Sequence, residues 1–221
     1  MPLKVPEKIL ANIVVLPAEN VSVNINAAEI QSIFKDPGLQ VQVMQPPGLP
    51  NQQVVITSLR QQIQLVMNPN GQIVVEDKSA DPNPKGIVAE IVNEFVALLA
   101  GRGLSKFRAY GFNFHLTFDT PGEELAGKFL SERFVRADLI QHKGNISVEG
   151  AGLRLYFDSA DARCDLRLEP AENERNQPRL FAAINYHYPI EDRGLPDRAS
   201  LQADFLGKWM MFTQLLERLV V

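Results

Sequence analysis

The sequence predicts an α+β protein built on an antiparallel sheet with helices packed on one face. The main observation is the stretch 109–118, AYGFNFHLTF, in which large apolar side chains alternate with small or polar ones. Strict alternation is typical of a strand with one buried face, and the aromatic content places this strand centrally in the sheet. A second observation is the hairpin signal NPNG at 68–71, between two apolar runs. A third is the helical spacing of apolar residues after Asn83 and after Asp197.

The first half of the chain predicts a strand, a short helix and several further strands. The β-branched run 9–16 is a strand candidate, and the alternation at 21–25 continues it or forms its neighbour. Asn26 can cap a helix over about 27–34. Apolar residues at 39–43 alternate with glutamines, which suits an edge strand with a solvated face; a polar ligand groove is the alternative interpretation. Further strands are expected over 54–58, 61–67 and 72–76.

Beyond the hairpin, helices alternate with strands to the end of the chain. Asn83 can cap a helix that Gly101 ends. Thr120 caps the next one, which runs through about Phe134, and Asp197 caps a last helix to about residue 219. The remaining strands are expected over 146–148, 153–157, 164–168 and 180–188.

These predicted elements divide into two halves of similar order. Residues 1–104 contain strand, helix, three or more strands and helix, and residues 105–221 contain strand, helix, four strands and helix. The expected hairpin strands line up as well, 63–67 with 153–157 and 73–77 with 164–168. One interpretation is an internal duplication, in which both halves share one curved sheet and one core. The alternative is that such runs recur by chance in α+β domains.

The element order resembles the duplicated saddle of the TATA-binding protein family. The resemblance is one of topology, and no residue motif carries it. It implies a DNA-binding face that is basic and inserts phenylalanine wedges into the minor groove. In this chain the candidate outward residues are mixed in charge: Gln62, Gln64, Asn113, Thr117, Arg154, Asp165 and Arg167. We therefore do not transfer the DNA-binding function.

Composition disfavours polyanionic partners and membrane spans. The chain has 221 residues, of which 45 % are apolar and 22 % charged, and its net charge is −4. Broad nucleic-acid or anionic-membrane binding needs a basic surface. Cys164 is the only cysteine, so no intrachain disulfide forms, which fits a reducing compartment. No run reaches the roughly 20 apolar residues of a membrane span, so we expect a cytoplasmic protein.

A polar row on the central strand is the candidate ligand site. Asn113, His115 and Thr117 share the face opposite the aromatic residues. Arg154 and Arg167 lie on two neighbouring strands, where they pair with acids or form a small anion site. The alternative is a structural, hydrogen-bonded face. No metal-ligand spacing, nucleophile elbow, phosphate loop or dinucleotide fingerprint occurs, so we predict no cofactor, no metal and no catalytic residue.

The last helix is more apolar than one sheet face can cover. Its stripe consists of Leu201, Phe205, Trp209, Phe212, Leu216 and Leu219. Met210 and Met211 lie beside that stripe, so with Trp209 they are the candidate interface of a homodimer. The alternative is that the helix packs between the sheet and another helix of the same chain. Glu90 and Glu94, by contrast, are expected on a solvated helix face.

Three hypotheses for function follow. The leading one is a non-enzymatic module that binds a protein partner or itself. The second is a small-ligand-binding protein or enzyme that uses the polar face around His115, which a deep pocket there would favour. The third is a nucleic-acid-binding saddle, which would need a continuous basic face.

Overall fold

The computed structural model describes residues 6–19, 23–34, 36, 38–49, 52–135, 151–160, 162–171, 178–190 and 194–220. The strands are β1 (Glu7–Pro17), β2 (Leu39–Met44), β3 (Gln53–Ser58), β4 (Ile63–Met67), β5 (Ile73–Asp77), β6 (Phe107–Asp119), β7 (Leu153–Ser159), β8 (Ala162–Pro170) and β9 (Arg179–Pro189). The helices are α1 (Ala27–Ile33), α2 (Ile87–Ala100), α3 (Ala126–Phe134) and α5 (Arg198–Val220), and a short 3-10 helix, Pro121–Glu123, precedes α3.

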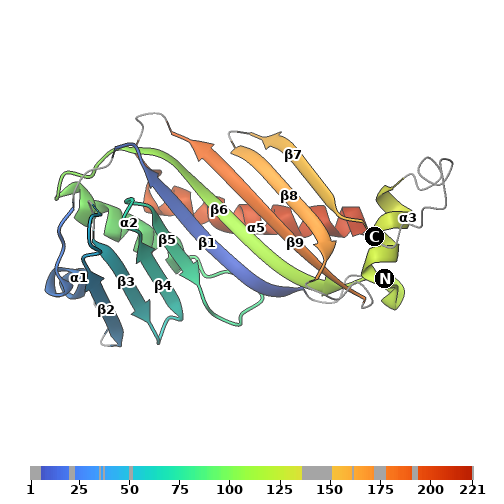
Figure 1. The fold of residues 1–221 in the computed structure, drawn as a ribbon, viewed down its shortest axis with the longest axis horizontal. Coiled ribbons are helices and arrows are strands. Elements are labelled where there is room, and N and C mark those ends of the chain that lie inside the picture. The colour runs from blue at the N-terminus through green and yellow to red at the C-terminus, as the bar shows by residue number, and fades with distance from the viewer. Residues whose placement is uncertain are drawn as a thin grey trace.

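The strands form a single open sheet with antiparallel neighbours throughout. Its order is β2-β3-β4-β5-β1-β6-β9-β8-β7, nine strands within the described ranges. Helices α2 and α5 lie behind this twisted sheet on one face, while α1 and α3 lie near its two ends (Figure 1). The other face carries no described helix. The prediction of an α+β fold with an antiparallel sheet is therefore confirmed.

The centre of the sheet is the pairing of β1 with β6. Ala11, Ile13 and Val15 of β1 lie opposite Phe114, Phe112 and Tyr110 of β6, and all six side chains are buried on the helix face. The alternation predicted for the central strand is thus confirmed. Since one face of β6 is filled with aromatic rings, its intervening residues must point to the uncovered face.

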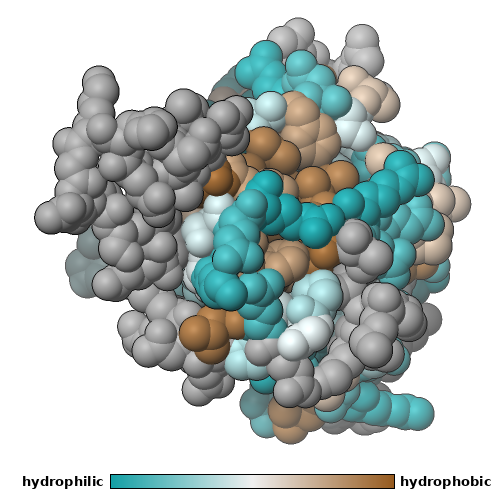
Figure 2. All heavy atoms as spheres, turned by 90° about the vertical axis from the view of Figure 1, so that its right-hand side faces the viewer, coloured by the Kyte–Doolittle hydropathy of each residue, from teal (hydrophilic) through white to brown (hydrophobic). Residues whose placement is uncertain are grey.

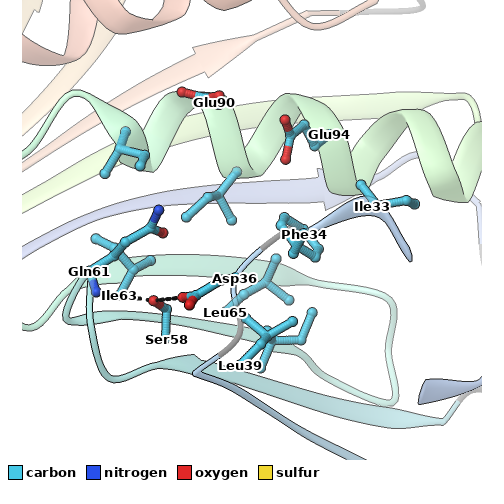
Figure 3. Close-up of a pocket in the computed structure, with 13 residues that line it drawn as sticks. Ile33, Phe34, Asp36, Leu39, Ser58, Gln61, Ile63, Leu65, Glu90 and Glu94 are labelled. Carbon is cyan, nitrogen blue, oxygen red and sulfur yellow. Dashed lines mark hydrogen bonds between the residues drawn. The ribbon is translucent and has the colours of Figure 1, made fainter. Parts of the chain in front are cut away.

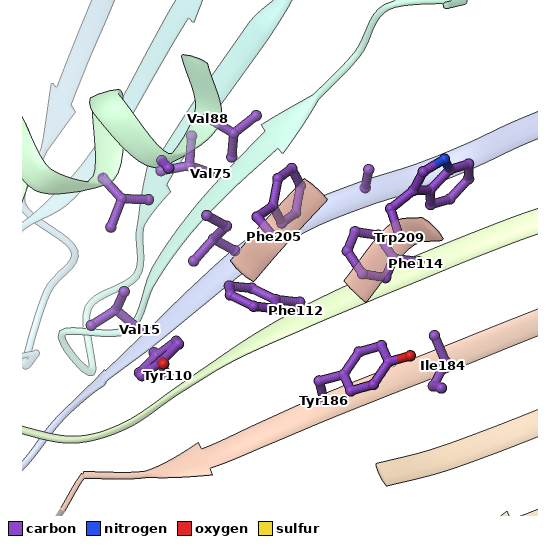
Figure 4. Close-up of a cluster of buried hydrophobic side chains, with 14 of the residues drawn as sticks. Val15, Val75, Val88, Tyr110, Phe112, Phe114, Ile184, Tyr186, Phe205 and Trp209 are labelled. Atoms are coloured by element: carbon purple, nitrogen blue, oxygen red, sulfur yellow. The ribbon is translucent and has the colours of Figure 1, made fainter. Parts of the chain in front are cut away.

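The rings of β6 pack directly against α5. The Phe114 ring lies 5.2 Å from that of Phe205, 5.4 Å from that of Trp209 and 6.4 Å from that of Phe212, measured between centroids. Figure 4 shows Phe114 of the strand beside Phe205 and Trp209 of the helix. The buried stripe of α5 matches the predicted one except at its end, where Val220 and not Leu219 is buried. The helix also contacts α2, as the alternative interpretation expected.

Several element boundaries differ from the sequence prediction. Helix α2 begins at Ile87, not at Pro84, because the Lys85 amide donates a 2.9 Å hydrogen bond to the Asp77 carboxylate and holds the preceding residues in a loop. Helix α3 begins at Ala126, since the left-handed φ of +72° at Gly122 interrupts the helix expected from Thr120.

Other differences concern strands. Val23 and Ile25 are buried but lie outside any strand, and Gln62 is in the turn before β4 and not on a strand face. Counted outward from the β1–β6 pair, β5 corresponds to β9 and β4 to β8. The hairpin alignment expected from the sequence, 63–67 with 153–157 and 73–77 with 164–168, differs from this order by one strand. The strand expected at 146–148 lies outside the described residues.

The surface at the α3 end of the sheet is mixed. Figure 2 shows hydrophobic residues gathered near the middle of this end, with hydrophilic ones in front of them and around them.

Where β1 starts, a buried ion pair ties it to the end of β5. Lys8 Nζ lies 2.7 Å from Asp77 Oδ2, and the two side chains are 2 % and 0 % exposed. Lys8 also donates to Ser79 Oγ, while the Ser79 and Lys85 amides donate to the same carboxylate. Burial alone would raise the pKa of Asp77, but the hydrogen bonds from Lys8, Ser79 and Lys85 offset burial and lower the pKa below 3.8.

We predict that Lys8→Met lowers the free energy of unfolding by about 3–5 kcal/mol, because it leaves a buried carboxylate without its counter-charge. Lys78→Met is the matched control, since the Lys78–Glu76 pair is exposed and should contribute less than about 1 kcal/mol. Because the folded-state pKa of Asp77 is lowered, its contribution is present above pH 3.8 and is lost as the pH falls through the folded value. Urea denaturation at neutral and acidic pH measures the cost of each substitution and its dependence on pH. If Lys8→Met and Lys78→Met lowered the free energy of unfolding equally, the buried ion pair would contribute no more than the exposed one.

We also predict that Phe114→Ala lowers the free energy of unfolding by about 3–5 kcal/mol, the usual cost of deleting a buried aromatic ring. His115→Ala, on the opposite face of the same strand, should cost less than about 1 kcal/mol. Chemical denaturation of both variants tests whether the alternation separates inside from outside. Similar losses would show that both faces of β6 are equally packed.

Candidate functional site

The uncovered face of the sheet carries the residues predicted as a ligand site, but not as one cluster. Asn113 belongs to a ladder of asparagines from the three central strands. Its Nδ2 donates a 2.8 Å hydrogen bond to Asn12 Oδ1 on β1, and its Oδ1 accepts from Asn185 Nδ2 on β9. Both ends of the Asn113 amide are thus engaged with neighbouring strands. This residue holds the centre of the sheet in register, and Asn12 is a partner that the sequence analysis did not single out.

His115 lies next to the ladder, opposite Leu10 of β1 and Ala183 of β9. Its ring meets the Phe181 ring edge-on at 5.4 Å between centroids. Burial lowers the pKa of His115, and the positive charge of Arg167 lowers it further, so the imidazole is neutral at neutral pH. No described residue forms a hydrogen bond with the ring, so within the described ranges no carboxylate orients it as a general base would require.

Thr117 and Arg167 do share a hollow. It has a volume of about 610 Å³ and is lined by residues of β1, β6, β8 and β9 together with Ala171: Ile9, Thr117, Arg167, Glu169, Pro170, Ala171, Arg179 and Phe181. Arg179 donates a 3.0 Å hydrogen bond to Thr117 Oγ1 and forms an ion pair with Glu7. The positive charges of Arg167 and Arg179 are therefore accompanied by the negative charges of Glu169 in the hollow and Glu7 beside it. The net charge of this region is close to zero. Asn113 and His115 do not line it.

Arg154 does not line that hollow and forms an ion pair with Asp165. Its Nε and NH2 atoms lie 3.0 and 2.7 Å from the two oxygens of Asp165 on β8. The guanidinium also covers the Tyr156 ring at 4.9 Å. The hydrogen bonds from Arg154 lower the pKa of Asp165. The cross-strand ion pair expected in this hairpin is confirmed, and it competes with any anion for the Arg154 guanidinium.

A second hollow, which the sequence analysis did not identify, lies between α1, α2 and the strands β2–β4. Its volume is about 440 Å³, and carboxylates from Asp36, Glu90 and Glu94 border an apolar floor. Figure 3 shows Glu90 and Glu94 along α2, with Asp36 and its hydrogen-bonded partner Ser58 on the strand side. Glu90 forms an ion pair with Arg198 of α5. The two glutamates therefore border a cavity, in contrast to the solvated face that was expected.

The predicted interface residues separate into one core residue and two exposed ones. Trp209 is only 4 % exposed and packs on Phe114, so it belongs mainly to the core. Met210 and Met211 are 58 % and 47 % exposed. Beside them is a hollow of about 260 Å³, lined by Pro6, Pro82, Asn83, Leu116, Phe118, Trp209, Met210, Thr213, Leu216 and Glu217. The C-terminal half of α5 thus presents apolar side chains next to a cavity that reaches the core.

Other possible sites are limited among the described residues. No group of His, Cys, Asp and Glu side chains there could hold a metal ion. Cys164 is buried, and burial raises the pKa of its thiol, which disfavours the nucleophilic thiolate. None of the described helices combines the length and apolar character needed to cross a bilayer. The sequence matches no protein-family model, and no curated protein is similar enough to count as a relative.

Proposed function

We propose that the chain is a non-enzymatic cytoplasmic module that binds another protein or a second copy of itself through the C-terminal half of α5. The exposed pair Met210 and Met211 is the observation that carries this proposal. Their neighbours Trp209 and Phe212 are buried against the sheet, so the exposed pair lies on the opposite side of a firmly anchored helix. The lone buried cysteine supports a reducing setting.

The chemistry of this surface suits a protein partner. Methionine side chains are unbranched and polarisable, and they adapt to the shape of an opposing surface. The adjacent hollow can receive an apolar side chain from the partner, with Phe118 and Trp209 as its walls. Thr213 and Glu217 supply a polar rim beside it.

A second candidate function is the binding of a small ligand on the uncovered face. The hollow at Thr117 and Arg167 favours it, because Arg167 makes no ion pair with a described residue. An anion with an apolar body would fit the guanidinium together with Ile9 and Phe181.

The ligand proposal predicts that anilinonaphthalene sulfonate, an anionic apolar dye, gains fluorescence on binding the protein. Arg167→Gln should weaken dye binding by roughly tenfold, the usual effect of losing one charge-assisted contact. Arg163→Gln, four residues away on the same face of β8, is the matched control and should leave the titration unchanged. Indistinguishable titrations for all three proteins would exclude Arg167 from a ligand site.

We further propose that residues 1–104 and 105–221 are duplicated halves of a saddle like that of the TATA-binding protein family. The strand order on the two sides of the β1–β6 pair supports this interpretation. We do not extend the proposal to nucleic acid, because Arg163, Arg167 and Arg179 on the uncovered face are interspersed with Asp165 and Glu169.

The interface proposal predicts that Met210→Glu combined with Met211→Glu abolishes the self-association made through α5 in sedimentation equilibrium, while the protein stays folded. Charges on an exposed apolar surface weaken a contact but cost the monomer less than about 0.5 kcal/mol. Leu59→Glu is the control, since Leu59 is 62 % exposed in the turn after β3 and does not line the hollow beside Met210. A wild-type protein that stays monomeric at micromolar concentration would rule out the homodimer and leave only a different protein as partner.

A further inference from the structure

The two edges of the sheet are unlike each other. At one edge, β7 carries Arg154 and Asp158, and the Arg154 side chain folds over the exposed Tyr156. At the other, β2 reads LQVQVM and contains no charged residue and no proline. Its register with β3 runs without a bulge from Leu39 opposite Ser58 to Met44 opposite Gln53. Charges, prolines and bulges are the usual means by which an edge strand avoids pairing with another chain, and β2 has none of them.

The apolar side chains of β2 are only partly covered at this edge. Leu39, Val41 and Val43 point to the helix face and pack on the core, yet all three remain partly exposed. Gln40 and Gln42 are exposed on the other face, and Met44 at the strand end is 46 % exposed. The outer edge of β2 has no partner strand among the described residues. Helix α1 packs on β2, so a further strand would pair with the outer backbone groups of β2 beside this helix.

We propose that β2 pairs antiparallel with β2 of a second copy, so that the sheet continues across a twofold axis. A second copy fits because the strand is self-complementary: an uncharged edge meets an uncharged edge without like-charge repulsion. The half-covered apolar row of one copy would then lie against the same row of the other and close the core.

Geometry restricts the register of this pair. Directly opposite residues in an antiparallel ladder point to the same face of the sheet. At the twofold axis, a residue of β2 must therefore lie opposite the same residue of the other copy and not opposite its neighbour in the sequence. Centring on Val41 places Leu39 opposite Val43 of the partner, and Gln40 opposite Gln42 of the partner. Every opposed pair is then apolar on the helix face and amide on the uncovered face.

This interface is separate from the surface proposed on α5, and the two can be distinguished by mutation. Gln40→Lys with Gln42→Lys places lysines opposite lysines at the twofold axis and should weaken the dimer by roughly 10- to 100-fold in sedimentation equilibrium. Gln40→Glu with Gln42→Lys alters the same two exposed positions but places each new carboxylate opposite a new ammonium group of the other copy. It should dimerise at least as well as the wild type.

The outcomes separate the two interfaces. Pairing through β2 is supported if the Gln40→Lys, Gln42→Lys variant is monomeric while two other variants still dimerise. These two are the Gln40→Glu, Gln42→Lys variant and the Met210→Glu, Met211→Glu variant. A dimer unaffected by the lysine variant overturns it, and so does a monomeric wild type. Two variants that each halve the size of a wild-type tetramer would support both interfaces. If the lysine variant fails to fold, amide hydrogen exchange in wild-type β2 decides: protection that rises with protein concentration supports the proposal, and constant protection overturns it.

Discussion

The antiparallel pairing of β1 with β6 is the interaction on which the rest of the structure depends. It joins the strands on its two sides into one sheet and aligns Ala11, Ile13 and Val15 with three aromatic rings. Those rings need a cover, which α5 supplies through Phe205, Trp209 and Phe212. Because a strand alternates its side chains, filling one face with rings also sends Asn113, His115 and Thr117 to the uncovered face. The polar character of that face is thus a consequence of the core.

Local patterns in the sequence predict those features that depend on burial and on neighbours close in the chain. The alternation in β6, the glutamine-flanked edge strand β2 and the helix cap at Asp197 are of this kind, since Asp197 accepts a hydrogen bond from Ser200 only three residues away. The start of α2 cannot be predicted from local patterns, because the hydrogen bond from Lys85 to Asp77 depends on where β5 ends. The asparagine ladder cannot be predicted in this way either, because its hydrogen-bonded partners lie 101 and 72 residues apart in the sequence.

The candidate sites also divide into those that local sequence patterns predict and those that depend on contacts between distant segments. Met210 and Met211 stand out in the sequence because the buried stripe of their own helix excludes them. The hollow between α1 and α2 does not stand out, because its walls come from five elements and its acidic border depends on how α2 lies over β2–β4. The two proposed interfaces also differ in physical origin. At α5 the contact would rest on side chains, whereas at β2 it would rest mainly on backbone hydrogen bonds between strands.

The long sequence separation of the central pairing bears on synthesis at the ribosome. Asn12 and Asn113 are 101 residues apart, so at translation rates of roughly 5–20 residues per second β1 waits roughly 5–20 s for its partner to emerge. During that interval one edge of β1 and the apolar row that β6 and α5 later cover are open to other nascent chains. Until β6 emerges, this unpaired strand is therefore the part of the nascent chain most open to aggregation.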